Sequence, residues 1–145
     1  MSTRALVDGS VRATLLPTTT IGAPVGPIAT TPIVGVTPCQ YLTAQAIFVF
    51  GAGGTNVTVY IQTSLDKGAS WIDVISFQFL VTTATKVSAV STYTALAAAI
   101  TPTDGTLAVN TILSGLLGDR VRAKYVTTGT YTGTTTLAVD IVTKG

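Results

Sequence analysis

Short stretches of alternating apolar and polar residues, separated by turn residues, are the feature that most constrains the fold of this chain. A period of two places successive side chains on opposite faces of a β-strand. About eight such stretches at a spacing of roughly 8–12 residues are typical of antiparallel sandwiches and barrels. The sequence therefore predicts an all-β fold, an antiparallel β-sandwich with a jelly-roll or immunoglobulin-like topology. The clearest expected strands are residues 41–50, 56–63, 71–81 and 120–128.

The composition also favours strands over helices. About one residue in five is Thr, which is β-branched and suits strands, and Glu is absent. Charged residues make up only 10% of the 145 residues, compared with roughly 25% in ordinary soluble domains. We therefore expect much of the surface to lie against neighbouring subunits. Further strands are expected at residues 10–16, 85–91, 107–113 and 134–143, whereas residues 92–100 are ambiguous and could form a helical turn.

The N-terminal part of the chain has a different pattern. Five of the six prolines fall within residues 17–38, and proline fixes φ and cannot donate a backbone hydrogen bond. The segment is nevertheless apolar, unlike a solvated linker. We expect residues 1–38 to form a short strand and an extended Pro-rich arm, and residues 39–145 to form the sandwich domain. The residues expected to contact a neighbouring subunit are Ile21, Val25, Ile28, Ile33 and Val34.

The segment SLDKGASW (64–71) fits the pattern S-x-D-x-G-x-x-W, the Asp-box known from sialidases. Ser64 and Asp66 can accept hydrogen bonds from backbone N–H groups of a turn. Gly68 can adopt a positive φ, and Trp71 can cover the turn with its ring. Sialidases carry several such turns and an arginine cluster, whereas this chain has one copy and no comparable arginine set. The motif therefore predicts a hairpin clamp rather than a glycosidase.

Residues suited to catalysis or metal binding are scarce. His and Glu are both absent, which removes the usual general acid–base groups and zinc ligands. Asp73 is expected in a structural ion pair with Lys86 or Arg122. Cys39 has no His to activate it and is expected to be a buried, inert thiol. We expect no enzyme activity, no metal and no cofactor.

The cations give one local cluster. Arg120, Arg122 and Lys124 follow an i, i+2, i+4 spacing, which places them on one face of a strand. This face is expected to be solvated, and the alternative is a site for an acidic partner. The net charge is only +2, too little for a nucleic-acid footprint. The sequence shows neither an apolar membrane span nor the apolar core of a signal peptide, so synthesis in a cytoplasm is expected.

Two segments resemble small virion proteins of tailed bacteriophages: NVTVYIQTSLDKGASWIDV (56–74) and LGDRVRAKYVTTGTYTGTTTLAVDIV (117–142). The resemblance covers about a third of the chain. It implies a non-enzymatic decoration or cement protein that stabilises the capsid head by docking its arm on neighbouring subunits. A neck or tail component is the alternative position. The implied partners are the major capsid protein, other virion proteins and further copies of the chain, with a trimer as one form, assembled in the host cytoplasm into the virion.

A glycan-binding β-sandwich appendage is the alternative from another functional class. Its candidate residues are Trp71, Tyr60, Asn56 and Asp73. Carbohydrate platforms need exposed aromatic rings, however, and the turn motif already uses Trp71. This alternative therefore depends on how exposed Trp71 and Tyr60 are in the folded chain.

Overall fold

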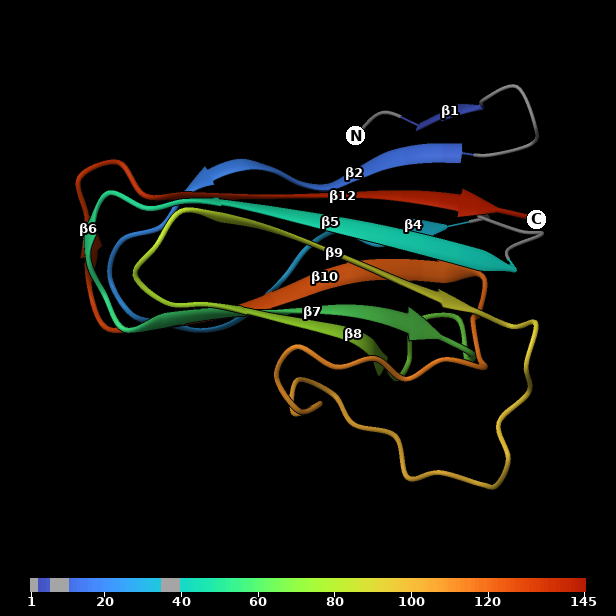
Figure 1. Ribbon diagram of the computed structural model, residues 1–145. Helices are drawn as coiled ribbons and strands as arrows, with labels where there is room; N and C mark the ends of the chain where they lie inside the picture. The colour runs from blue at the N-terminus through green and yellow to red at the C-terminus, as the bar shows by residue number, and fades with distance from the viewer. Residues whose placement is uncertain (1–2, 6–10, 35–39) are drawn as a thin grey trace.

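A computed structural model describes residues 3–5, 11–34 and 40–145 and shows two antiparallel sheets packed face to face (Figure 1). Sheet A contains, in spatial order, β1 (Thr3–Ala5), β2 (Val11–Thr20), β12 (Thr136–Lys144), β5 (Tyr41–Val49) and β9 (Ala84–Ser91). Sheet B contains β3 (Val25–Ala29), β10 (Arg120–Thr128), β7 (Asn56–Ser64) and β8 (Ile72–Phe79), and β4 (Ile33–Val34) also pairs with β10. A small third sheet joins β6 (Ala52–Gly53) to β11 (Tyr131–Thr132). None of the described residues forms a helix that could cross a membrane.

The eight longer strands pair in a nested order. Strand β2 pairs with β12, β3 with β10, β5 with β9, and β7 with β8. The pairings of β12 with β5 and of β10 with β7 then complete the two sheets. This nesting of first with last strands is the jelly-roll order, and it differs from the strand order of an immunoglobulin fold. The expected antiparallel β-sandwich is confirmed, with jelly-roll topology.

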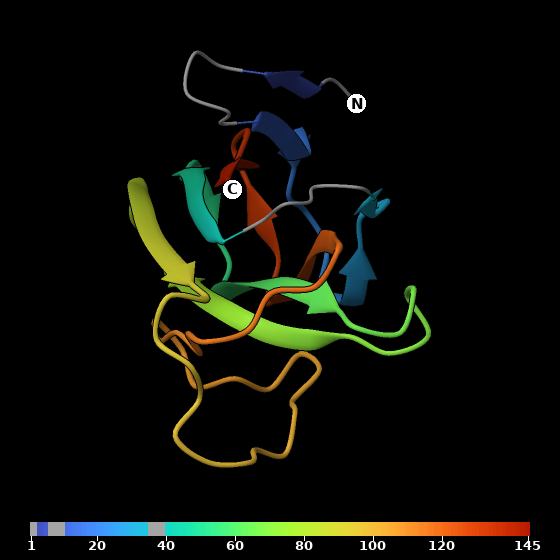
Figure 2. The same ribbon diagram turned by 90° about the vertical axis from the view of Figure 1, so that its right-hand side faces the viewer.

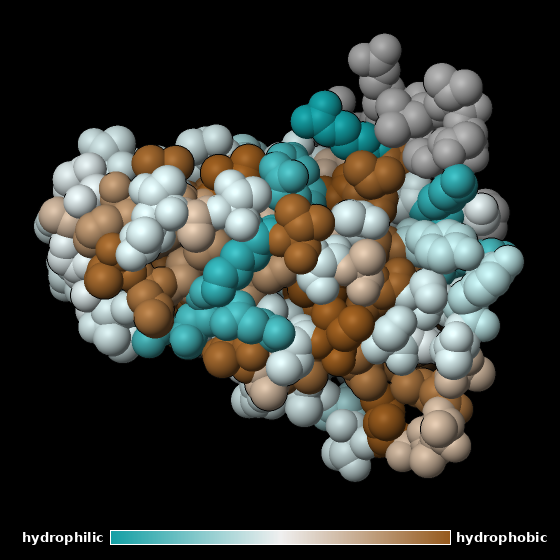
Figure 3. Space-filling view, viewed as in Figure 1, coloured by the Kyte–Doolittle hydropathy of each residue, from teal (hydrophilic) through white to brown (hydrophobic). Residues whose placement is uncertain are grey.

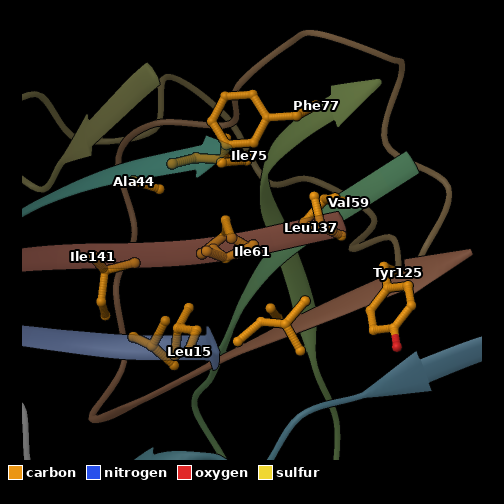
Figure 4. Close-up of a cluster of buried hydrophobic side chains, with 14 of the residues drawn as sticks. Leu15, Ala44, Val59, Ile61, Ile75, Phe77, Tyr125, Leu137 and Ile141 are labelled. Atoms are coloured by element: carbon orange, nitrogen blue, oxygen red, sulfur yellow. The ribbon is translucent and has the colours of Figure 1, made fainter. Parts of the chain in front are cut away.

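The core lies between the two sheets and is built from the inward-facing half of each alternating strand. Figure 4 shows Leu15 and Ile141 of sheet A and Ile61 and Tyr125 of sheet B among the side chains of this core. An aromatic cluster extends this core, because Phe48 lies 5.2 Å from Phe79 and 5.7 Å from Tyr131 between ring centroids. The Tyr131 hydroxyl donates to the Leu80 carbonyl at 2.7 Å, so this buried polar tip is satisfied.

Residues 11–34 belong to the sandwich, which corrects the expectation that this segment is an arm on a neighbouring subunit. Strand β2 pairs with β12, and β3 and β4 pair with β10. Ile21 and Ile33 are therefore buried in the chain's own core, at 4% and 6% exposure. Val25 is half-buried against the core, whereas Ile28 and Val34 remain exposed. Cys39 and the rest of 35–39 lie outside the described residues, as do 1–2 and 6–10.

Two prolines, Pro17 and Pro27, lie within strands and are tolerated there because the ladder is interrupted beside them. Pro17 sits in β2 where the register with β12 shifts between Leu16 and Thr19. Pro27 sits in the edge strand β3, where the register with β10 also shifts. Bulges and edge strands are the sheet positions that do not need the missing N–H group. The Pro-rich pattern therefore indicated irregular strands rather than a detached segment.

A long loop, residues 92–119, covers the outer side of sheet B and passes beside the edge of β8 (Figure 1). The expected strand 107–113 is reduced there to one bridge, between Ile112 and Ile75. Asn110 has a φ of 58°, which breaks the extended run. The loop nevertheless provides hydrogen-bond partners for the edge of β8, because the Ser76 N–H donates to the Thr111 carbonyl at 3.0 Å. Residues 92–100 form bends and no helical turn.

Candidate functional site

A connected group of polar side chains, two of them fully buried, lies between the outer face of sheet B and this loop. Strand β7 contributes Gln62, β8 contributes Asp73, and β10 contributes Arg122 and Lys124. The loop contributes Asp104. Gln62 lies opposite both Asp73 and Arg122 in the ladder, so neighbouring strands bring the three side chains together. We refer to these five residues as the sheet B polar cluster.

Asp73 is fully buried, and its carboxylate is enclosed by the loop. Gln62 Nε2 donates to it at 2.8 Å, and Thr103 Oγ1 donates at 2.9 Å. The backbone N–H groups of the loop complete the shell, from Gly105 at 2.7 Å, Thr106 at 3.0 Å and Leu107 at 3.1 Å. Consecutive backbone N–H groups form a concave site that favours an anion. Asp73 is thus the anchor that ties the loop to sheet B.

The expected ion pair of Asp73 with Lys86 or Arg122 is replaced by these backbone contacts. Lys86 Nζ donates instead to the Gln78 carbonyl at 2.6 Å and to Asn110 Oδ1 at 3.0 Å. Arg122 Nε donates to Gln62 Oε1 at 2.7 Å. The physical reason is that loop residues 105–107 bring donors to Asp73 that no strand neighbour could supply.

The face formed by Arg120, Arg122 and Lys124 is occupied within the chain rather than open to an acidic partner. Lys124 Nζ lies 2.8 Å from Asp104 Oδ1, and Arg122 lies 3.9 Å from the same oxygen. Their side chains are only 15% and 16% exposed, and Arg120 is 25% exposed at 3.6 Å from Asp119. Desolvation opposes ionisation of Asp104, but hydrogen bonds from Lys124 and Gln62 still hold its pKa below the usual range. The loop therefore neutralises this cationic face.

The turn 64–71 contains the hydrogen bonds that its motif predicts. Ser64 Oγ accepts from the Gly68 N–H at 2.8 Å and donates to Asp66 Oδ1 at 2.9 Å. Asp66 Oδ1 accepts from the Ser70 N–H at 2.8 Å, and Asp66 Oδ2 accepts from the Ser70 hydroxyl at 2.5 Å. These contacts satisfy the turn without any external ligand.

Gly68 and Trp71 complete the clamp. Gly68 has a φ of 88°, a conformation that L side chains resist. Trp71 is 8% exposed and packs beside Gly68, since a Cβ placed on Gly68 would lie 3.6 Å from Trp71 Cζ2. The Arg122 guanidinium lies 4.3 Å from the centroid of the Trp71 ring system. Trp71 therefore joins the turn to the sheet B polar cluster.

The turn should lose stability in acid through Asp66. Hydrogen bonds from the Ser70 hydroxyl, the Ser70 N–H and Ser64 lower the pKa of Asp66 from 3.8 to about 2. Because the folded pKa lies below the unfolded one, this stabilisation is complete above pH 3.8 and is lost as the pH falls towards about 2. Asp66→Asn should remove that part of the pH dependence of unfolding. An NMR titration that gave Asp66 a pKa near 3.8 would contradict the account.

The aromatic residues proposed for glycan binding are not exposed. Trp71 and Tyr60 are each 8% exposed, and Asp73 is inaccessible. The aromatic pair that does reach the surface is Tyr41 with Tyr93, at 37% and 77% exposure and 5.5 Å between centroids. Sequence reasoning did not single out this pair, because the contact joins the first residue of β5 to a loop residue far along the chain.

Three of the described carboxylates are held by hydrogen bonds within the chain. Asp66, Asp73 and Asp104 each accept several hydrogen bonds from turn, loop or strand groups. No group of three or more metal-ligating residues occurs among the described residues. Sequence reasoning missed Gln62 and Thr103, since ordinary strand and loop residues carry no signal of a buried carboxylate partner. Comparisons of the chain with protein-family models, curated proteins and solved structures found no match.

Proposed function

We propose that the chain is a non-enzymatic structural protein of a tailed-phage virion, placed on the capsid head as a decoration or cement protein. The observation that carries the proposal is an exposed sheet face without charge. A surface of this kind loses little by leaving water, which suits a permanent contact with another protein. The alternative is a position in the neck or tail, which would use the same uncharged contact surface. The proposed partners are the major capsid protein and other virion proteins.

The uncharged face lies on the outer side of β5 and β9. Between Thr43 and Val49 of β5, and between Thr85 and Ala89 of β9, the exposed or half-buried residues that point outward are Thr43, Gln45, Ile47, Val49, Thr85, Val87 and Ala89. Charged outward side chains are found on β2 and β12, as Arg12, Asp140 and Lys144. We refer to the seven residues of β5 and β9 as the uncharged face.

The rest of the surface supports the same proposal. Figure 3 shows strongly hydrophilic side chains in only a few places, with weakly polar and apolar groups over most of that view. This agrees with a charged fraction of 10%. So low a charged fraction is unusual for a domain that stays free in water.

The proposed contact does not use residues 11–34. Residues 11–34 stabilise the sandwich itself, so docking is assigned to the uncharged face rather than to an arm. Each Å² of apolar surface that this face buries contributes about 25 cal/mol, before the cost of ordering both partners. Most of these side chains are short or β-branched, so little rotamer freedom is lost when they are fixed.

A lysine in the uncharged face should prevent incorporation into particles. Val49→Lys places an ammonium group on this face, at a position now 44% exposed. The matched control is Val109→Lys, at a position 46% exposed on the loop 92–119. We expect Val49→Lys to lower occupancy on purified particles at least about tenfold, because a buried unpaired charge is costly, and Val109→Lys to leave it unchanged. Both variants should unfold at the wild-type denaturant concentration.

The outcomes separate the alternatives. Equal occupancy of both variants would contradict docking through the uncharged face. Absence of the wild-type chain from purified particles would contradict the virion role altogether. Immunogold labelling of wild-type particles then distinguishes the positions, because a decoration protein labels the whole head and a neck component labels one vertex.

A further inference from the structure

The open edge of β9 is the least protected sheet edge whose side chains the structure describes. The edge of β8 is covered by the loop 92–119, and the edge strand β3 contains Pro27 and a register shift. Strand β9 ends sheet A, contains no proline and pairs with β5 without any register shift. Figure 2 shows β9 at the outer margin of the sheet. An edge of this kind is a template for another strand.

The backbone of β9 presents unpaired groups along this edge. Ser91 bonds to the loop and not to β5, since its N–H donates to Ser114 Oγ at 3.0 Å and its carbonyl accepts from the Gly115 N–H at 2.9 Å. In a regular antiparallel strand every second residue directs its backbone N–H and C=O groups to the same side of the strand. The N–H and C=O groups of Thr85, Val87 and Ala89 therefore also point away from β5, and no hydrogen-bond partner for them occurs among the described residues.

We propose that this edge pairs with the same edge of a second copy of the chain, antiparallel about a two-fold axis at Val87. In this register Val87 faces its own copy, and Thr85 faces Ala89 of the second copy. The outward groups then form about six hydrogen bonds. Lys86 faces Ser88 rather than a second Lys86, so like charges do not meet. The strand is thus self-complementary, as a two-fold interface requires.

Two features beside the edge make room for the second strand. Lys86 does not guard the edge, because its ammonium group is held by the Gln78 carbonyl and Asn110 and lies 5.4 Å from the Phe79 ring centroid. A hollow of about 290 Å³ lies next to Val87 and Ser88. Ser76, Phe77 and Asn110 also line this hollow.

Pairing through β9 would also join the uncharged faces of two copies into one continuous surface. This inference goes beyond the virion role and does not depend on it, because the dimer is measured with the isolated chain. Failure of the dimer would leave docking on particles untouched, and failure of docking would leave the dimer untouched.

The test measures the mass of the full chain by analytical ultracentrifugation from about 1 µM to about 500 µM. The wild type should form a dimer within this range. Val87→Lys places like charges opposite each other and should weaken the dimer at least about fivefold. Val34→Lys is the matched control, since Val34 is 56% exposed and Val87 is 59% exposed, and it should match the wild type. The proposal would be overturned by a wild type that stays monomeric, or by a Val87→Lys variant that dimerises as tightly as the wild type.

Cross-linking tests the register directly. Facing Cα atoms of a hydrogen-bonded antiparallel pair lie about 5.5 Å apart, within reach of a disulfide. In a Cys39→Ser chain, Val87→Cys should therefore form a covalent dimer under mild oxidation. Val34→Cys in the same chain should remain monomeric. A Val87→Cys chain that gave no more covalent dimer than Val34→Cys would contradict pairing at Val87.

Discussion

Asp73→Ala is expected to lower the free energy of unfolding by about 3–5 kcal/mol, because it removes the buried acceptor of several hydrogen bonds that hold the loop. The groups that lose their acceptor are Thr103 Oγ1 and the backbone N–H groups of residues 105–107, while Gln62 Nε2 keeps only its bond to Asp104. Urea unfolding measures the loss. Hydrogen exchange at residues 105–107 should become faster at the same time, because Asp73 is what holds this part of the loop.

Asp119→Ala is the matched control for Asp73→Ala. Asp119 is 45% exposed, and its carboxylate lies 3.6 Å from Arg120, a surface ion pair. Its loss should cost no more than about 1 kcal/mol. If Asp73→Ala proved as mild as Asp119→Ala, with unchanged hydrogen exchange at residues 105–107, the carboxylate would not be the anchor of the loop.

Trp71→Ala is expected to destabilise the domain by about 3–5 kcal/mol, in the range measured for buried aromatic residues cut to alanine. Trp71 is 8% exposed and packs against Gly68 and the Arg122 guanidinium. Its removal therefore opens a cavity and also exposes one side of the sheet B polar cluster. Denaturant unfolding followed by circular dichroism measures the effect without relying on the lost tryptophan fluorescence.

Tyr93→Ala provides the comparison, since Tyr93 is 77% exposed and should lose at most about 0.5 kcal/mol. The two variants also separate the hairpin clamp from glycan binding. A Trp71→Ala chain that kept its stability and lost binding to a sugar would contradict the structural role of the turn. The structural role of the turn would be supported if Trp71→Ala lost much stability and the wild type bound no sugar.

Local patterns were enough to predict most strands and the turn. Strand β10 begins and ends where the alternation of Val121, Ala123 and Tyr125 with three cations predicts. The turn 64–71 was equally predictable, because Ser64, Asp66 and Gly68 act on backbone groups within a few residues. In both cases the information is local, either a period of two or contacts at short separation in the chain.

Features that depend on distant partners could not be predicted. Ile21 and Ile33 look like contact residues of an arm until β2 is known to pair with β12 and β4 with β10. Residues 107–113 alternate in polarity like a strand, but they pair with β8 through only one bridge, between Ile112 and Ile75. Asp73 looks like half of an ion pair because nothing in its neighbourhood along the chain reveals the N–H groups of residues 105–107. In each case the deciding contact is made by residues far away in the sequence, so local patterns led to a wrong prediction.

Electron cryo-microscopy of tailed-phage particles assembled with and without the chain tests the virion role most directly. The account predicts extra density on the head that fits the jelly roll, with the uncharged face, marked by Thr43, Gln45 and Val49, turned towards the shell. Particles that show no difference in density would contradict the virion role. Density in which the loop 92–119 faces the shell and the uncharged face points to solvent would contradict the proposed docking surface.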